Sequence, residues 1–239
     1  MIKKITVPKI KIFADGANKS AILSLGKNPL VKGFTTNPSL MRKAGVKDYK
    51  KFAKDLLKTI KTKPISFEVF SDDFKEMERQ ARQISSWGKN VYIKIPITDT
   101  RGESSFDLIK KLSRDGIKIN VTAIMTLEQV KHIAKAFYFV TPAIISVFAG
   151  RIADTGRDPV PVMQSAAQFL KKFPKAELLW ASPRQPYDLF VATKAGCDII
   201  TVFPEIINRL NRIGKIPEVF SLDTVKMFYK DARAAGYKL

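Results

Sequence analysis

Residues 65–95 begin with Ile65-Ser-Phe-Glu-Val-Phe70 and end with Val91-Tyr-Ile-Lys-Ile95. Both ends are short, largely apolar runs, which are typical of buried β-strands. The segment between them carries apolar residues at helical spacing, namely Phe74, Met77, Ala81 and Ile84. This stretch therefore predicts a strand, a helix and a second strand, which is one repeat of an α/β fold.

The same alternation of short apolar and amphipathic segments continues in both directions, with a repeat of roughly 25 to 30 residues. The predicted strands are Ile10–Asp15, Val31–Thr36, Ile65–Phe70, Val91–Ile95, Ile117–Thr122, Ala143–Phe148, Glu177–Ala181 and Asp198–Val202. Eight such units in 239 residues predict a single α/β domain over residues 1–239, a (β/α)8 TIM barrel of parallel strands. A doubly wound open sheet is the alternative, but its nucleotide-binding forms are disfavoured because the glycine motifs of dinucleotide and ATP sites are absent from the sequence.

Two helical segments illustrate how the chain surrounds this barrel. From Tyr49 to Ile60, apolar residues occupy one helical face and lysines occupy the other. A further segment, 221–236, follows the eighth unit and is surplus to the barrel. Its predicted apolar face consists of Val225, Phe228, Tyr229 and Ala232.

Composition excludes several kinds of site. A single cysteine rules out an internal disulfide, and with a single histidine it also rules out the usual zinc-binding spacings. Those two residues, Cys197 and His132, are interpreted as a small buried residue and a surface or boundary residue. The longest uncharged stretch, residues 136–150, is too short to span a membrane, and no signal-peptide core follows the N-terminal lysines. We therefore expect a cytoplasmic protein with no membrane contact.

Lys94 is the most informative polar residue in a predicted strand, because Ile93 and Ile95 flank it. An ammonium group in such a strand loses hydration, which favours the neutral amine. A neutral lysine amine can attack a carbonyl and form a Schiff base, whose iminium accepts electrons when a C–C bond breaks or forms. A structural ion pair with Glu68 on the neighbouring strand is an equally good interpretation at this point.

Other polar residues lie in the predicted strands or at their C-terminal ends, where barrel active sites occur. Asn120 and Thr122 are two residues apart and therefore point to the same side of their strand. Asp15 and Glu68 are carboxylates suited to moving protons between a substrate hydroxyl, a water and the amine. A self-satisfied hydrogen-bond network filling the barrel is the alternative, but four strands contributing polar groups favour a site.

Two later strands end in groups suited to binding an anion. Arg151 follows Ser146-Val-Phe-Ala-Gly150, and Ser182 and Arg184 lie in Ala181-Ser-Pro-Arg184. A guanidinium group binds phosphate oxygens through two parallel donors, and barrel enzymes often hold phosphate near the ends of late strands. These residues are the predicted phosphate-binding groups.

At the predicted strand ends, six motifs resemble those of the transaldolase family, specifically its short form that includes fructose-6-phosphate aldolase. In chain order they are Ile12-Phe-Ala-Asp-Gly-Ala-Asn18, Gly33-Phe-Thr-Thr-Asn-Pro-Ser39, Val91-Tyr-Ile-Lys-Ile-Pro96, Asn120-Val-Thr122, Ser146-Val-Phe-Ala-Gly-Arg151 and Ala181-Ser-Pro-Arg184. They span nearly the whole chain and occur in the family's order.

The resemblance implies a role for each residue of the predicted site. Lys94 would be the Schiff-base lysine, Asp15 an acid/base residue, and Glu68 and Thr122 the pair that holds the catalytic water. The residues implied to contact the sugar are Asn37, Asn120, Ser146 and Phe148. Those implied to bind phosphate are Arg151, Ser182 and Arg184.

The implied reaction moves a dihydroxyacetone unit from a ketose phosphate, such as sedoheptulose 7-phosphate or fructose 6-phosphate, to an aldose phosphate. It belongs to the pentose phosphate pathway and uses no metal and no organic cofactor. Fructose-6-phosphate aldolase activity, a C–C lyase reaction, is the alternative. The aldolases carry Gln where Glu68 stands and Tyr where Phe148 stands, so both residues are of the transaldolase type. The sequence departs from the family pattern at Gly16, which usually is a small hydroxyl residue, and at Pro183.

The formal net charge of +20 raises a different hypothesis, a nucleic-acid-binding protein without catalysis. The lysines are dispersed over helix faces, as between Lys47 and Lys63, without a stripe of aromatic and basic residues. This distribution is typical of solvated helices and argues against nucleic acid as the partner. The resemblance instead implies sugar phosphates as partners and a homo-oligomer, a pentamer or decamer, in which the C-terminal helix packs on a neighbouring subunit.

Overall fold

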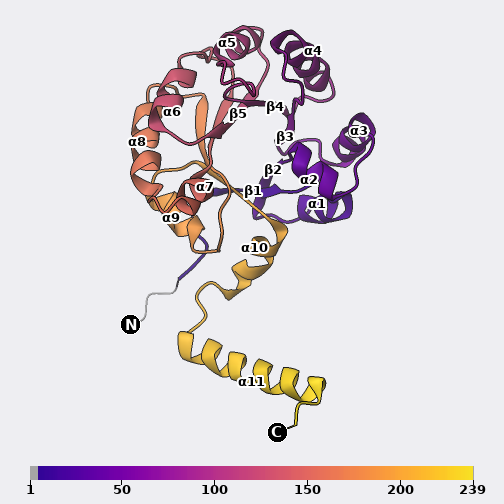
Figure 1. Cartoon of the computed structure of the whole chain (residues 1–239), viewed down its shortest axis with the longest axis vertical. Helices are drawn as coiled ribbons and strands as arrows, with labels where there is room; N and C mark the ends of the chain where they lie inside the picture. The colour runs from indigo at the N-terminus through magenta and orange to yellow at the C-terminus, as the bar shows by residue number, and fades with distance from the viewer. Residues whose placement is uncertain (1–4, 239) are drawn as a thin grey trace.

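Eight parallel strands form a closed barrel in the computed structural model of this chain, which describes residues 5–238 (Figure 1). The strands are β1 (Lys11–Asp15), β2 (Val31–Thr35), β3 (Ile65–Glu68), β4 (Val91–Pro96), β5 (Ile119–Ile124), β6 (Ala143–Val147), β7 (Ala176–Trp180) and β8 (Ile199–Val202). Each strand pairs with the next along the chain, and β8 pairs with β1. The closed barrel confirms the predicted (β/α)8 fold and rules out the open sheet. All eight predicted strands occur, with ends displaced by at most two residues.

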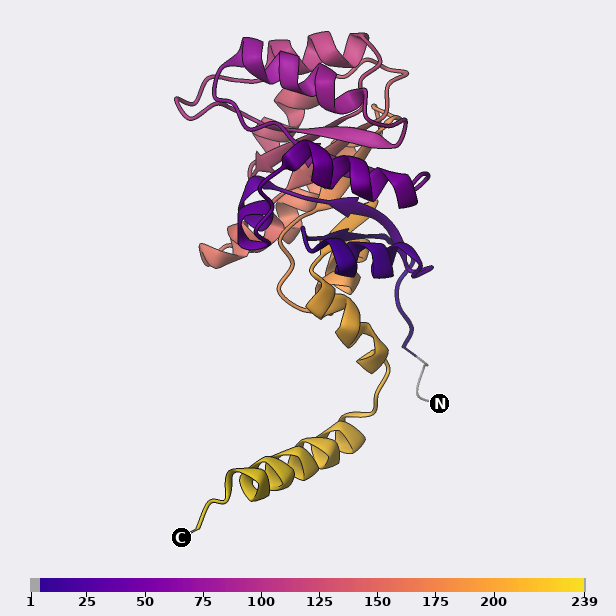
Figure 2. The ribbon, with the colours of Figure 1, turned by 90° about the vertical axis from the view of Figure 1, so that its right-hand side faces the viewer.

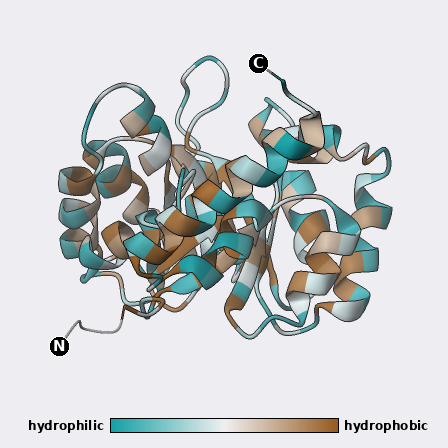
Figure 3. Ribbon diagram, turned by 90° about the horizontal axis from the view of Figure 1, so that it is seen from below, coloured by the Kyte–Doolittle hydropathy of each residue, from teal (hydrophilic) through white to brown (hydrophobic). Residues whose placement is uncertain are grey.

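Helices surround the barrel and alternate with its strands (Figure 1). They are α1 (Lys19–Gly26), α2 (Pro38–Lys43), α3 (Tyr49–Thr59), α4 (Phe74–Ser85), α5 (Phe106–Arg114), α6 (Leu127–Ala134), α7 (Ala149–Asp154), α8 (Val160–Leu170), α9 (Asp188–Lys194), α10 (Pro204–Arg209) with the 3-10 turn η1 (Leu210–Arg212), and α11 (Pro217–Ala235). As the sequence pattern predicts, α4 buries Met77, Ala81 and Ile84. In Figure 3 the helices carry hydrophobic residues on some faces and hydrophilic residues on others. No helix among the described residues is both long and apolar enough to cross a membrane.

Alternation along each strand separates two cores. In β4, Ile93 and Ile95 face outward and belong to the large apolar cluster under the helices. Tyr92 belongs to a smaller apolar cluster inside the barrel, and Lys94 has the same parity as Tyr92. The smaller cluster consists of Phe13, Tyr92, Ile144, Leu179, Ala181 and Ile199. The barrel interior is therefore partly apolar. Lys94, a polar residue of the predicted site, also occupies a position that faces this interior.

Phe13 fills the interior beside β2 because Gly33 has no side chain. A Cβ atom at position 33 would lie 2.6 Å from carbons of the Phe13 ring, which is closer than such contacts occur. Phe13 is only 2% exposed, so its ring has little room to move aside. Glycine at this position thus allows an aromatic ring to pack within the barrel, two residues before Asp15.

Helix α11 stands apart from the barrel (Figure 2). It begins at Pro217, four residues before the predicted start at residue 221, because proline is favoured in the first turn of a helix. It ends before Gly236, whose φ of 68° is the left-handed conformation of a helix C-cap. None of its 19 residues is buried.

The contact between Phe13 and Gly33 leads to a stability prediction. Gly33→Ala should lower the free energy of unfolding by about 1–3 kcal/mol, because the added methyl group overpacks the barrel interior. In a Phe13→Leu background the same substitution should cost less, since the smaller side chain leaves room. Urea unfolding of the four proteins measures both costs. Equal costs in the two backgrounds would show that the Phe13 ring is not the obstacle.

Candidate active site

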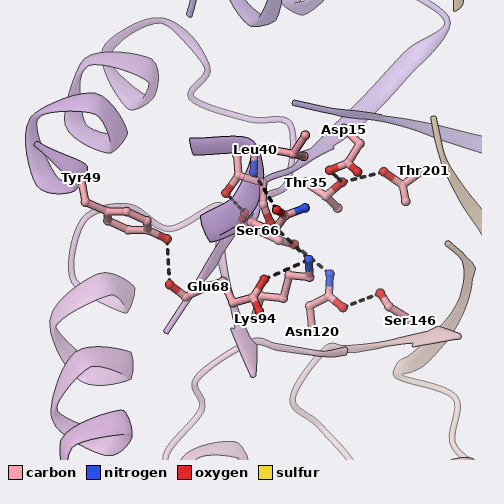
Figure 4. Close-up of polar contacts among 12 residues, drawn as sticks. Asp15, Thr35, Leu40, Tyr49, Ser66, Glu68, Lys94, Asn120, Ser146 and Thr201 are labelled. Atoms are coloured by element: carbon pink, nitrogen blue, oxygen red, sulfur yellow. Dashed lines mark hydrogen bonds and ion pairs between the residues drawn. The ribbon is translucent and has the colours of Figure 1, made fainter. Parts of the chain in front are cut away.

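Lys94 lies inside the barrel, and its side chain is 7% exposed. Strand register places Glu68 of β3 beside it on one side and Asn120 of β5 on the other. The Lys94 Nζ atom lies 3.1 Å from Glu68 Oε2 and donates a hydrogen bond to the Thr36 carbonyl oxygen over 3.3 Å (Figure 4). The ion pair weighed from the sequence is therefore present. The pair lies where Lys94 borders a pocket, so the amine is also within reach of a bound molecule.

Two adjoining pockets at the C-terminal ends of the strands share Lys94. Both are also lined by Asn37, Phe148, Arg151 and Phe203. The first pocket adds Asp15, Thr35, Ser146, Ala181, Ser182 and Thr201. The second adds Pro38, Ser39, Leu40, Glu68, Thr122 and Ala123. The structure thus brings most of the predicted site residues to one end of the barrel, the end where barrel active sites occur.

Asp15 ends β1 and faces the first pocket. Its Oδ1 atom accepts a hydrogen bond of 2.8 Å from the Thr35 hydroxyl, which also lies 2.6 Å from the Thr201 hydroxyl. Burial raises the pKa of Asp15 above its ordinary value of 3.8, while the Lys94 charge and the Thr35 hydrogen bond oppose that rise. Asp15 is therefore a carboxyl group with a raised proton affinity that faces the same pocket as an amine.

Two buried oxygens near Lys94 have capacity for a further partner. Among the described residues, Thr122 Oγ1 has no hydrogen-bond partner, and Glu68 Oε2 has only the Lys94 ammonium 3.1 Å away. Both residues line the second pocket. The backbone at Glu68 is held by Tyr49, whose hydroxyl donates a 2.8 Å hydrogen bond to the Glu68 carbonyl oxygen. Buried polar atoms normally find partners, so these two oxygens are suited to binding a water or a substrate hydroxyl.

Asn120 connects three strands beneath the pockets. Its Nδ2 atom donates to Ser66 Oγ over 3.0 Å, and its Oδ1 atom accepts from Ser146 Oγ over 2.6 Å. Asn120 is fully buried, and it is not among the pocket-lining residues in the described part of the chain. The structure therefore places it where it orients Ser146, and its predicted contact with a sugar stays a prediction.

Asn37 is held by the helix that follows it. Its side-chain oxygen caps α2 by accepting a 2.9 Å hydrogen bond from the Leu40 amide. The carbonyl end of the side chain is thus occupied, and the amide NH2 is the end that remains to donate. Asn37 lines both pockets, in agreement with its predicted position in the site.

Arg151 and Ser182 both line the first pocket. The segments that carry them approach closely, because a Cβ atom at Gly150 of α7 would lie 1.6 Å from the Ser182 carbonyl oxygen, just beyond β7. Ser182 itself has a φ of 64°, in the left-handed region. The Arg151 guanidinium carbon lies 5.2 Å from the centre of the Phe148 ring. A guanidinium group and a hydroxyl therefore border the same pocket, and their predicted contact with phosphate stays a prediction.

Arg184 has a different environment from Arg151. Its guanidinium group forms an ion pair with Asp154 at the end of α7, and its backbone amide donates to Asp188 over 2.6 Å. The two pockets, as residues 5–238 line them, do not include Arg184. Its predicted contact with phosphate stays a prediction.

The remaining residues considered from the sequence take ordinary positions. A side chain at Gly16 would meet nothing within 4 Å, so this departure from the family pattern leaves open space. His132 is exposed and its ring packs 4.7 Å from Phe106, whereas Cys197 is buried. No cluster of three or more potential metal ligands occurs in the described part of the chain.

Sequence reasoning did not single out four residues that line the pockets or support the site, namely Thr35, Ser66, Thr201 and Phe203. A signal for two of them existed, because Ser66 is two residues before Glu68 and Thr35 is two residues after Gly33. Side chains separated by two residues in a strand share a face. Thr201 is a lone polar residue in a short apolar strand, and Phe203 follows that strand.

Comparison with known proteins agrees with this geometry. The family model for transaldolase/fructose-6-phosphate aldolase matches residues 12–238. The chain belongs to this family. A probable transaldolase of Nitrosopumilus maritimus is 34% identical over 203 residues, covering 84% of this chain and 87% of that protein. A probable transaldolase of Thermoanaerobacter sp. is 31% identical over 231 residues, covering 96% of this chain and all of that protein.

Solved structures outside the transaldolase/fructose-6-phosphate aldolase family share the barrel. A dihydrodipicolinate synthase from Rhodopseudomonas palustris superposes with a TM-score of 0.59 at 14% identity, covering 96% of this chain and 81% of that one. The tryptophan synthase alpha subunit from Campylobacter jejuni gives a TM-score of 0.55 at 15% identity, covering 87% of this chain and 90% of that one. At these identities the likeness concerns the fold alone.

The raised pKa of Asp15 leads to a prediction about stability and pH. The folded protein binds this proton more tightly than the unfolded chain, so Asp15 lowers the free energy of unfolding as pH rises above its ordinary pKa of 3.8. Asp15→Asn removes the ionisation and should stabilise the protein relative to wild type at pH 7. That gain should shrink toward pH 4. Urea unfolding at both pH values measures it, and a gain that does not change with pH would contradict the assignment.

Proposed function

We propose that this chain is a transaldolase that uses Lys94 to transfer a dihydroxyacetone unit between sugar phosphates. The observation that carries the proposal is the placement of the Lys94 amine inside the barrel, 3.1 Å from Glu68 Oε2, in a pocket that also contains Asp15. Membership of the transaldolase/fructose-6-phosphate aldolase family supports it. The setting that we propose is the pentose phosphate pathway in the cytoplasm.

In the proposed reaction, Lys94 Nζ attacks the C2 carbonyl of the ketose phosphate, and loss of water gives an iminium. Removal of the C4 hydroxyl proton then breaks the C3–C4 bond, whose electron pair moves onto the iminium nitrogen as an enamine forms. The first aldose phosphate leaves. The enamine attacks the aldehyde carbon of the acceptor, whose oxygen takes up a proton, and water releases the new ketose phosphate and the free lysine.

The surroundings of the two carboxylates divide the proton transfers between them. Glu68 Oε2 lies 3.1 Å from the amine and faces the same pocket as the Thr122 hydroxyl. It is therefore placed to hold the water that is released and later consumed at C2. Asp15 occupies the other pocket and has a raised pKa, so it is suited to exchanging a proton with the C4 hydroxyl. Arg151 and Ser182 are the proposed contacts of the phosphate group.

Two residues favour transfer over simple aldol cleavage. By resemblance, aldolases carry Gln and Tyr where this chain has Glu68 and Phe148. Both residues line the second pocket beside Lys94 and Thr122. Protonation of the enamine carbon would end the reaction as cleavage. Phenylalanine has no hydroxyl group that could deliver this proton. This difference favours an enamine that persists until the acceptor aldehyde arrives.

Trapping tests the proposed Schiff base. Borohydride reduction in the presence of fructose 6-phosphate should add a covalent dihydroxyacetone or hexose unit to Lys94, because reduction makes the C–N bond permanent. Intact mass measurement and peptide mapping identify the adduct. Wild type and Lys58→Ala, which removes an exposed lysine of α3, should both be trapped, whereas Lys94→Ala should not.

The Schiff-base assignment fails if wild type gives no adduct, or if a folded Lys94→Ala protein is trapped as well as wild type. Circular dichroism establishes that the variant is folded. Formation of sedoheptulose 7-phosphate that requires erythrose 4-phosphate supports transfer. Release of free dihydroxyacetone without an acceptor would instead assign the aldolase reaction.

We also propose that the protein assembles into a ring of five subunits, or two such rings, through α11. The helix has no buried residue, and it exposes large apolar side chains that include Val225 at 59% and Phe228 at 63%. Exposed apolar surface of this extent marks an interaction site. The partner expected by resemblance is a second copy of this chain.

Substitution on α11 tests this assembly. Val225→Glu combined with Phe228→Glu should lower the native mass, because two carboxylates would be buried in the interface without partners. Lys226→Glu, a charge change on the same exposed helix, serves as the control. Light scattering coupled to size exclusion gives the masses. A monomeric wild type, or a double variant with the wild-type mass, would show that α11 does not hold subunits together.

A further inference from the structure

Three side chains from three different strands form a hydrogen-bonded chain at the edge of the first pocket. Thr201 of β8 lies 2.6 Å from Thr35 of β2, oxygen to oxygen, and the Thr35 hydroxyl donates to Asp15 Oδ1 over 2.8 Å. The pairing of β1 with both β2 and β8 brings these strands together. Figure 4 shows Thr35 between Asp15 and Thr201. Neither the family comparison nor the proposed reaction gives Thr201 a role.

The direction of each hydrogen bond follows from counting protons. Each threonine hydroxyl has one proton to donate. Thr35 gives its proton to Asp15, so the contact between the two hydroxyls requires Thr201 to be the donor. The Thr201 hydroxyl has no other hydrogen bond within residues 5–238. The chain therefore runs from Thr201 through Thr35 to Asp15, and it ends on the carboxylate.

Burial makes this chain hard to replace. Thr35 is 3% exposed and Thr201 is 6% exposed, so bulk water does not readily take the place of either hydroxyl. A hydroxyl that accepts one hydrogen bond becomes a better donor in the next, particularly where the local dielectric constant is low. Thr201 therefore strengthens the bond that Thr35 makes to Asp15. It also restrains the rotation of the Thr35 hydroxyl, which would otherwise have one partner.

Several charged groups face Asp15 from other elements. Lys94 of β4 lowers its pKa and Glu68 of β3 raises it. Arg151 of α7 lines the first pocket with Asp15, and Lys43 of α2 and Glu205 of α10 line a neighbouring pocket that Asp15 also borders. All of these charges stay in place when Thr201 is changed. The effect of the hydroxyl chain can therefore be measured separately.

We propose that Thr201 is a positioning residue that acts through Thr35 to orient Asp15 and to hold it in the ionised form that accepts a proton. What Asp15 does in turnover rests on the proposed function. The hydrogen-bond chain and its effect on Asp15 do not. Thr201 would thus adjust the pH range of the reaction without taking part in bond formation.

A titration of the full-length, ligand-free protein tests the inference without relying on activity. Thr201→Val keeps the shape of the side chain and removes the donor. Thr201 reaches Asp15 by strengthening the bond that Thr35 donates, and such strengthening is a fraction of one charge-assisted hydrogen bond, so the acid dissociation constant of Asp15 should fall by about 1.5- to 3-fold. Thr201→Ser restores the hydroxyl and should titrate like wild type. The readout is the carbon-13 shift of the Asp15 carboxyl group, assigned with Asp15→Asn.

A matched control separates this effect from general loss of a buried hydrogen bond. Thr141 is 4% exposed and donates to the Ser113 carbonyl oxygen over 2.8 Å, just before β6 begins. Thr141→Val removes a bond of the same kind outside the two pockets and should leave the Asp15 titration unchanged. An equal change in both valine variants, or no change in Thr201→Val, would overturn the inference.

The Thr35→Val background tests whether Thr201 acts through Thr35. Adding Thr201→Val there should change the Asp15 titration no further, because the connection is already broken. A further change would show that Thr201 acts on Asp15 by another route and would overturn the proposal.

If the Lys94 adduct forms in wild type, the acid limb of the kcat/KM profile for transfer should move to higher pH in Thr201→Val. A failed adduct would reject the proposed function, and the titration would still decide the role of Thr201.

Discussion

The burial of one ammonium group beside one carboxylate governs the arrangement of this site. Lys94 and Glu68 lie 3.1 Å apart with side chains that are 7% and 13% exposed. Removing such a pair from water is costly, and the cost is offset only where the geometry is good and further hydrogen bonds are available. The Thr36 carbonyl oxygen supplies one such bond to Lys94. The ends of β2, β3 and β4 must therefore keep a fixed register for the pair to remain inside the barrel.

The barrel interior that holds this pair also contains an apolar region. Phe13 and Tyr92 belong to that region, and each precedes a site residue by two positions, Asp15 and Lys94 respectively. The strand period of two thus places an aromatic ring and a functional group on the same side of one strand. Close packing of rings such as Phe13 against Gly33 leaves little freedom for the backbone that carries the polar groups. Rigid placement of those groups is what proton transfer over hydrogen-bond distances requires.

Local pattern was enough to predict the eight strands and the interior position of Lys94, because apolar neighbours on both sides leave a strand residue no exposed face. The two-residue spacing of Asn120 and Thr122 also predicted that they share one face of their strand. Contacts between distant strands could not be predicted, because strand register decides them. Thr35 and Thr201 are 166 positions apart and meet only because the barrel closes. The pairing of Arg184 with Asp154 across 30 positions is likewise a consequence of how α7 lies against the end of β7.

Two carboxylates near one amine acquire different properties because their neighbours differ. Glu68 Oε2 lies 3.1 Å from the Lys94 ammonium and has no other polar partner among the described residues. Asp15 accepts a hydrogen bond from a buried hydroxyl, and desolvation raises its pKa against the influence of Lys94. A pair of carboxyl groups in unlike environments is a common way for one site to carry out two kinds of proton transfer at one pH. The structure thus gives the proposed reaction a carboxylate oxygen beside the lysine nitrogen, where it can serve the water that leaves and returns at C2. A separate carboxyl group serves the hydroxyl that loses its proton when the C–C bond breaks.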